Sequence, residues 1–249
     1  MKQNLWMGLV GGMTALFSLI AFAEPAADYA REKKWADEVV PGLVVGDAVY
    51  LQTPRGHHKF LTLFTPVEGH KAAIIVHGMG IHPDWGMIGT LRTELADRGF
   101  ATLSIQMPVL AADAQSAAYQ PTFPEAAERI AQAVDFLKAK GYTQLAIVSH
   151  SMGSRMSHVY LSGEPDAAVM AWASLGLQQV DYDKLKLPVL DLYGDNDLPP
   201  VLAGAAKRKR SLAASNSRQL AIHHADHFYT GHEEEMVEAV VVFLNDTLK

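Results

Sequence analysis

The chain has 249 residues, of which 49% are hydrophobic and 19% charged, a composition too apolar for intrinsic disorder and suited to one large folded domain. The formal net charge of −6 excludes the overall basic field with which proteins attract nucleic acid, so we expect no nucleic-acid partner. The absence of cysteine excludes disulfides, thiolate metal sites and a cysteine nucleophile.

The first residues have the pattern of a secretory signal peptide. Lys2 precedes an apolar stretch at residues 5–22, and Ala21-Phe22-Ala23 forms a small-x-small cleavage site. The sequence therefore predicts a signal peptide at residues 1–23 that is cut after Ala23. A periplasmic or secreted location follows, with no stable membrane insertion after cleavage. An uncleaved N-terminal anchor is the alternative, although glycines and hydroxyl residues in the stretch would make a weak span.

Residues 24–45 form a charged N-terminal extension, which could be a tether, a cap over a sheet edge or a contact for a partner. The folded domain is placed at residues 46–249. It opens with two strand-like runs, at 48–53 and 59–64, separated by a Pro-Arg-Gly turn signal. This arrangement predicts an antiparallel hairpin.

Beyond the hairpin, apolar runs alternate with amphipathic segments. The continuous apolar run at residues 72–76 is typical of a strand buried on both faces of a parallel sheet. Further strands are predicted at 101–105, 145–148, 169–175, 189–193 and 219–222, and helices at 86–98, 124–140, 152–161, 201–212 and 233–248. This alternation predicts an α/β fold with a mostly parallel central sheet and helices on both faces.

One strand-to-helix junction carries a candidate nucleophile. The strand at 145–148 leads into Ser149-His150-Ser151-Met152-Gly153 and then a helix, which is close to the Gly-x-Ser-x-Gly nucleophile elbow. The flanking positions must be small because strand and helix backbones crowd there, and Ser149 replaces the first glycine. Ser151 is the predicted nucleophile. A strand-to-helix turn also needs small residues for structural reasons alone, so the motif by itself permits a purely structural interpretation.

With this elbow in its strand–turn–helix context, the chain resembles the α/β-hydrolase superfamily over residues 47–248. The resemblance implies the α/β-hydrolase fold, with an antiparallel N-terminal hairpin beside the parallel strands. It also implies a nucleophile, an acid and a histidine in that chain order.

Segments after the last two predicted strands match the remaining positions of the family pattern. Asp197 matches the acid, with Asp195 as second choice, while Asp191 lies inside a strand and is expected to be structural. These acids could instead form a turn and cap the next helix. His227, followed by the aromatic Phe228, matches the catalytic histidine.

A His-Gly segment follows the strand at 72–76 and resembles the oxyanion loop of the same family. It reads His77-Gly78-Met79-Gly80. The resemblance implies that the backbone N–H groups of Met79 and Met152 stabilise a tetrahedral oxyanion.

Together these residues imply a serine hydrolase that cleaves a carboxylic ester or related acyl bond and requires no cofactor and no metal. The connection at 176–188 is too short for a lid domain. The Ala-rich segment at 107–123 is expected to form an apolar wall, which favours a small uncharged acyl substrate over a phosphate or a sugar. Esterases, thioesterases, peptidases and lactonases share this triad, and the sequence does not distinguish among them.

Two other classes of function stay open. The first is a non-catalytic α/β-hydrolase-like protein of the cell envelope that binds a ligand or partner, because the first elbow glycine is missing. The second and weaker one is a metal-binding protein, because imidazoles and a carboxylate cluster near the C-terminus. The cluster consists of His223, His224, Asp226, His227 and His232.

Overall fold

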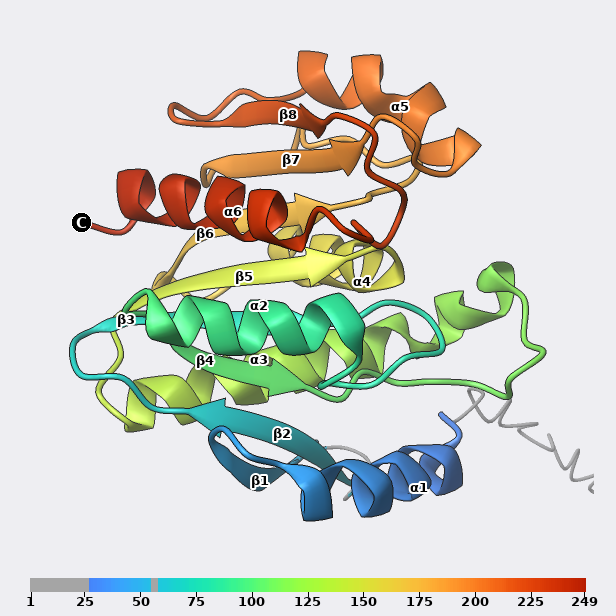
Figure 1. Cartoon of the computed structure of the whole chain (residues 1–249), viewed down its shortest axis with the longest axis vertical. Coiled ribbons are helices and arrows are strands. Elements are labelled where there is room, and N and C mark those ends of the chain that lie inside the picture. Colours follow the sequence, from blue (N-terminus) through green and yellow to red (C-terminus); the bar gives the residue numbers. More distant parts are fainter. Residues whose placement is uncertain (1–26, 55–57) are drawn as a thin grey trace, which may run out of the picture.

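A central sheet organises the chain (Figure 1). The computed structural model describes residues 27–54 and 58–249, so the predicted signal peptide lies outside the described residues. Within them the sheet has eight strands in the order β1-β2-β4-β3-β5-β6-β7-β8. The predicted hairpin is confirmed: β1 (Asp47–Gln52) pairs antiparallel with β2 (Lys59–Thr65), and β2 pairs antiparallel with β4 (Ala101–Ile105).

The remaining neighbours in the sheet are all parallel, as the alternation of strands and helices predicted. In the central strands nearly every residue is buried, because helices cover both faces and leave no side of the strand to water. These strands are β3 (Lys71–Val76), β5 (Gln144–His150), β6 (Val169–Leu175) and β7 (Val189–Gly194). The parallel part ends at the edge strand β8 (Arg218–Ile222), in which only Ile222 is buried.

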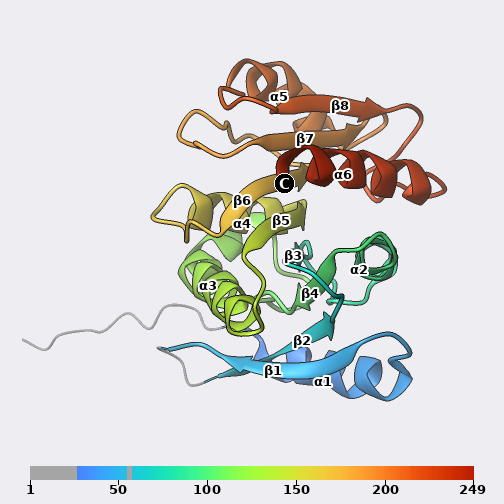
Figure 2. The same ribbon diagram turned by 90° about the vertical axis from the view of Figure 1, so that its left-hand side faces the viewer.

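The helices form one layer on each side of the sheet (Figures 1 and 2). One face is covered by α2 (Gly86–Asp97) and α6 (Glu233–Thr247), and the other by α3 (Phe123–Ala139), α4 (Met152–Leu161) and α5 (Pro199–Arg210). The segment predicted as a loop at 107–123 contains a 3-10 helix, η2 (Ser116–Thr122). No helix in the described part of the chain has the length and apolar character needed to cross a membrane.

The N-terminal extension is tied to the domain by a buried ion pair. Its helix α1 (Tyr29–Val39) lies along the hairpin and continues into η1 (Val40–Gly42). Glu32 of α1 is 4% exposed and accepts hydrogen bonds of 2.9 and 3.0 Å from the guanidinium of Arg129, a fully buried residue of α3. Of the roles that the sequence left open for this segment, these contacts match a cap at the sheet edge.

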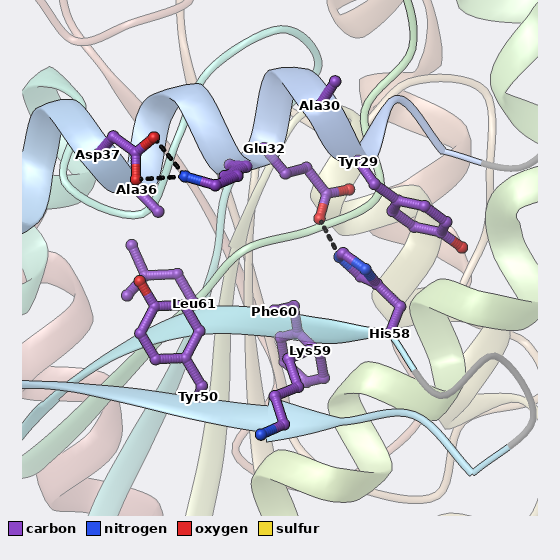
Figure 3. A pocket seen from close by; sticks show the side chains of 11 residues that line it. Tyr29, Ala30, Glu32, Ala36, Asp37, Tyr50, His58, Lys59, Phe60 and Leu61 are labelled. Atoms are coloured by element: carbon purple, nitrogen blue, oxygen red, sulfur yellow. Dashed lines mark hydrogen bonds and ion pairs between the residues drawn. The ribbon is translucent and has the colours of Figure 1, made fainter.

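A cavity of 520 Å³ remains between α1 and the hairpin. Two pairs of its polar groups contact each other: Glu32 lies 3.3 Å from His58 (Figure 3), and Lys33 lies 2.6 Å from Asp37. The His58 ring also stacks on the ring of Tyr29, with 3.8 Å between ring centroids. Neither Ser151 nor any other predicted site residue lines this cavity, so it is separate from the site described next.

Asp191, the acid that sequence analysis expected to be structural, lies inside β7. Asp191 is fully buried, and both of its carboxylate oxygens accept from Nε of Arg208 at 3.0 Å. One of those oxygens also accepts from the Tyr182 hydroxyl at 2.8 Å. Because its lone pairs and charge are satisfied inside the core, Asp191 is structural, as its position inside the strand predicted.

Candidate active site

Ser151 occupies the sharp turn between β5 and α4. Its φ of 55° and ψ of −117° are unusual for a residue with a side chain and hold backbone strain. The turn is braced on both sides: the N–H of Ser151 donates to the carbonyl of Leu175 at 2.8 Å, and its own carbonyl accepts from the N–H of Ser154 at 3.0 Å. This geometry is that of the predicted elbow, which presents the side chain at the carboxyl edge of the sheet.

The small residues on either side of Ser151, Ser149 and Gly153, are explained by different contacts. A Cβ on Gly153 would lie 2.3 Å from the carbonyl oxygen of His77, so only glycine fits there. Ser149 has room for its side chain, and its hydroxyl accepts from the buried indole N–H of Trp172 at 2.7 Å. The departure from the glycine motif therefore gives a buried donor its partner and leaves the turn intact.

A continuous series of hydrogen bonds joins Ser151, His227 and Asp197. The distance from Ser151 Oγ to His227 Nε2 is 2.9 Å, and that from His227 Nδ1 to Asp197 Oδ1 is 2.6 Å. Because a carboxylate only accepts, the proton lies on Nδ1 and leaves Nε2 free to accept from the serine hydroxyl. Asp197 and His227 are 4% and 7% exposed, so the series is shielded from water.

Asp195, the second choice for the acid, points elsewhere. It is exposed and contacts Nδ1 of His223, and its other oxygen accepts from the N–H of His224 at 2.6 Å. Although Asp195 lies only two residues from Asp197, the structure does not bring it to His227. The two carboxylates therefore have separate surroundings, and only Asp197 orients the histidine next to the serine.

His150 holds the backbone of His227 in place. Its Nε2–H donates to the carbonyl of His227 at 2.8 Å, and the centroids of the two rings are 4.7 Å apart. Burial, followed by the nearby charge of His227 when protonated, lowers the pKa of His150 from 6.5 to about 3. The ring therefore stays neutral across the range in which enzymes work, and it positions the loop without adding a charge beside the nucleophile.

His77 orients the predicted oxyanion loop. Its Nδ1–H donates to the carbonyl of Gly78 at 2.8 Å, while its Nε2 accepts from the N–H of Met107 at 2.9 Å. Across a trans peptide the C=O and N–H point in opposite directions. The carbonyl of Gly78 faces His77, so the N–H of the next residue, Met79, faces away from it.

Both predicted oxyanion donors remain available beside the nucleophile. Among the described residues, none accepts a hydrogen bond from the backbone N–H of Met79 or of Met152, the latter being in the first turn of α4. The loop lies close, because a Cβ on Gly78 would be 3.2 Å from Cβ of Ser151. The arrangement supplies two unused backbone donors and a helix N-terminus where negative charge would develop during attack on a carbonyl.

A cavity of 200 Å³ opens at Ser151. Its lining consists of Gly78, Met79, Ile81, Ser116, His150, Ser151, Met152, Arg155, Gln178, Leu198, His227 and Phe228. The expected apolar wall from residues 107–123 is wrong, because this segment contributes only Ser116 to the lining. Its large side chains Met107 and Tyr119 are each 1% exposed and belong to the core instead.

The histidine-rich segment divides into separate environments. Both ring nitrogens of His227 are engaged by Ser151 and Asp197, which leaves it no lone pair for a metal. In the described part of the chain, one exposed group could hold a metal ion: Asp195, His223 and His224, whose ligand atoms lie within 4.8 Å of one another. The structure therefore does not bring His227 into a common ligand set with its neighbours.

Several solved structures resemble this one over most of its length. A dienelactone hydrolase from Anabaena variabilis is 20% identical, with 82% of this chain and 99% of that chain aligned at a TM-score of 0.66. The esterase Pf2001 of Pyrococcus furiosus is 14% identical, with 83% of this chain and 98% of that chain aligned at a TM-score of 0.65. Est1E from Butyrivibrio proteoclasticus is 18% identical, with 80% of this chain and 98% of that chain aligned at a TM-score of 0.64.

The chain has the α/β-hydrolase fold. No curated protein matches the sequence. Residues 43–128 match the model of a family described as a protein of unknown function, DUF3530. That match includes the loop of His77 and Met79 but ends before the elbow, so the likeness to the α/β-hydrolase fold comes from the whole structure.

Sequence analysis missed one glycine that packs against His227 and Asp197. Gly176 follows β6 with φ of 60°, and a Cβ there would lie 2.9 Å from Cε1 of His227 and 3.5 Å from Oδ2 of Asp197. A side chain at this position would displace the histidine–carboxylate pair. The signal available in the sequence was a glycine directly after a predicted central strand, where a parallel sheet brings its loops to the same edge.

The two buried histidines predict that the fold loses stability in mild acid. Burial lowers the pKa of His77 and His150 from 6.5 to about 3, and unfolding restores ordinary values. Between pH 3 and pH 6.5 the unfolded state binds more protons than the folded state. The free energy of unfolding therefore falls as the pH drops below about 6.5, and the full contribution of the two histidines is present above that value. Each histidine contributes up to about 1.4 kcal/mol per pH unit, so from pH 7 to pH 5 the expected loss is on the order of 4 kcal/mol.

Urea unfolding followed by circular dichroism at pH 7 and pH 5 measures this loss. His77→Gln should reduce the difference between the two pH values by about half, because one of the two histidines no longer titrates on unfolding. His70→Gln, which removes an exposed imidazole, is the control. An unchanged difference in His77→Gln would contradict the assignment of the acid sensitivity to this buried ring.

Proposed function

We propose that this protein is a serine hydrolase that cleaves small carboxylic esters. The observation that carries the proposal is the unbroken series of hydrogen bonds from Asp197 through His227 to Ser151, beside two unused backbone donors and a cavity. A hydroxyl bonded to a histidine that is in turn oriented by a carboxylate is the general pattern of an activated nucleophile. The names of the structural neighbours, an esterase and a dienelactone hydrolase among them, lie in the same class of chemistry.

The reaction then runs in two halves. Ser151 Oγ attacks the acyl carbon while its proton passes to Nε2 of His227, and the N–H groups of Met79 and Met152 stabilise the oxyanion. The alcohol leaves with the proton from His227, and an acyl-enzyme remains. A water molecule gives its proton to His227 and attacks the acyl carbon, the acid departs, and the proton returns to Ser151. Every step uses groups of this chain and water, so the proposal includes no cofactor and no metal.

The surroundings of Ser151 support an ester of modest size. A cavity of 200 Å³ holds a short acyl or alcohol group, and its rim carries exposed apolar side chains, Met79, Leu198 and Phe228. Esters release an alkoxide more readily than peptides release an amine, which places esters ahead of amides. A lactone is an internal ester, and one structural neighbour is named as a dienelactone hydrolase. We further propose that the protein acts in the periplasm or outside the cell, as the predicted signal peptide implies.

A fluorophosphonate probe tests the proposal, because it reacts with a serine only when a neighbouring base and an oxyanion site activate it. The native protein should take up one label per chain, on the peptide that contains Ser151. Heat-denatured protein and Ser151→Ala should take up none. Chelator should leave the labelling unchanged, whereas a metal-dependent site would lose it. No labelling of the native protein would favour a non-catalytic binding protein.

A further inference from the structure

Arg155 is the one arginine, lysine, aspartate or glutamate among the described residues that line the cavity at Ser151. Arg155 lies in α4, four residues after Ser151, and is half-buried in the lining. Four residues correspond to about one helical turn, or roughly 6 Å along the axis. No aspartate or glutamate of the described residues lines this cavity, although acidic residues outnumber basic ones by 27 to 21 in the chain as a whole. The lining therefore carries the positive charge of Arg155 but no carboxylate, and the nearest acid described above, Asp197, is hydrogen-bonded to the far side of His227.

Within residues 27–54 and 58–249, no carboxylate forms an ion pair with Arg155. Its guanidinium lies 3.7 Å from the thioether sulfur of Met152 and 5.3 Å from the centroid of the Phe123 ring. Three fully or nearly fully buried arginines of this protein are paired with carboxylates, Arg129 with Glu32, Arg92 with Asp84 and Arg208 with Asp191. The half-buried Arg31 instead donates to the carbonyl of Leu110 at 2.6 Å, whereas no oxygen of the described residues accepts from the guanidinium of Arg155. A guanidinium partly removed from water without a carboxylate loses hydration that no protein group restores.

We propose that Arg155 binds a carboxylate on the substrate, so that this hydrolase acts on anionic esters. The inference rests on the proposed function and replaces the uncharged substrate expected from the sequence. A guanidinium presents parallel N–H donors that match a carboxylate, and Ser116 and Gln178 add neutral hydrogen-bonding groups to the same lining. The carboxylate lies about one helical turn from the ester bond, on a short chain that the apolar lining covers.

Packing alone is the competing role for this side chain. Arg155 covers the ring of Phe123, and a cation over an aromatic ring contributes to stability without any ligand. The two roles differ in what they change. Loss of packing lowers stability and affects neutral and anionic substrates alike, whereas loss of a carboxylate-binding group affects only the anionic ones.

Two pairs of matched esters test the proposal, each pair differing by a carboxylate against its uncharged carboxamide. In the first pair the charge is on the acyl side: p-nitrophenyl glutarate hemiester and p-nitrophenyl 4-carbamoylbutyrate. In the second it is on the leaving group: 4-carboxyphenyl butyrate and 4-carbamoylphenyl butyrate. In at least one pair the wild type should prefer the anionic ester in kcat/KM. Arg155→Met should lower that preference about 10- to 100-fold, as expected for a charged hydrogen bond.

Further variants separate the carboxylate from general damage. Arg155→Lys should recover part of the preference, because it keeps the charge but not the planar donors. Arg210→Met removes the same charge from the exposed surface of α5 and should leave the preference as in the wild type. Raising the salt concentration should weaken the preference in the wild type and have little effect in Arg155→Met.

Unchanged preferences in both pairs for Arg155→Met, or a wild-type preference for the carboxamides, would overturn the inference and leave the proposed esterase standing. If no ester is hydrolysed at all, the proposed function fails and binding decides the inference. Calorimetry on Ser151→Ala should then detect the hemiester binding at least tenfold more tightly than its carboxamide, and the added change Arg155→Met should abolish this difference. Equal affinities would reject the role of Arg155.

Discussion

Ser151→Ala is expected to fold like the wild type and to lose hydrolysis of p-nitrophenyl butyrate by about 10⁴- to 10⁶-fold, as removal of a triad nucleophile does. In the described part of the chain the hydroxyl has one side-chain partner, Nε2 of His227 at 2.9 Å, so its removal leaves little in the core unsatisfied. Alanine also removes no bond that braces the turn, because the contacts to Leu175 and Ser154 come from the backbone.

Steady-state kinetics of purified protein measure this loss, with circular dichroism and thermal unfolding to show that the variant is folded. Ser215→Ala, which removes an exposed hydroxyl far along the chain, is the matched control and should keep the wild-type rate. Ser151→Ala at near wild-type turnover would mean that another group attacks the ester, and the assignment of the elbow as the reaction centre would be wrong.

The strands, helices and elbow could be predicted because their signals are local. A strand buried on both faces needs a continuous apolar run, and the helices α2 and α3 end beside Gly99 and Gly141, whose positive φ values terminate them. The elbow is likewise specified within five residues. Ser151, Asp197 and His227 could be proposed because the α/β-hydrolase pattern fixes their order in the chain, and the structure brings all three together.

The rest of the site depends on which segments meet at the carboxyl edge of the sheet, and no local pattern carries that information. Arg155 has the helical position of an ordinary surface arginine, and only the fold shows that it faces a cavity without a counter-ion. Gly176 matters because His227, far away in sequence, packs against its backbone. Segment 107–123 lacks periodicity, so nothing in it indicated that Met107 and Tyr119 turn toward the core.

Asp197→Asn is expected to lower kcat by about 10⁴-fold, and Asp195→Asn to change it by no more than about threefold. Oδ1 of Asp197 accepts from both Nδ1 of His227 and the N–H of Leu198, each at 2.6 Å. An asparagine whose amide nitrogen takes this place would donate to Nδ1, force the proton onto Nε2 and block acceptance from Ser151. With its oxygen in this place the tautomer survives, but the negative charge that stabilises the imidazolium is lost.

When the asparagine oxygen takes the place of Oδ1, its NH₂ group takes the place of Oδ2, and this is also unfavourable. Oδ2 of Asp197 is buried, has no hydrogen-bond partner among the described residues and lies against Gly176, so an amide NH₂ there would leave two donors without a protein acceptor. Asp195 has no such constraint, because it is exposed and an asparagine oxygen can still accept from the N–H of His224. Comparing kcat of the two folded variants is therefore a matched test. A larger loss of kcat in Asp195→Asn would assign the role of the acid to Asp195. His227 would then have to adopt an orientation different from the one described.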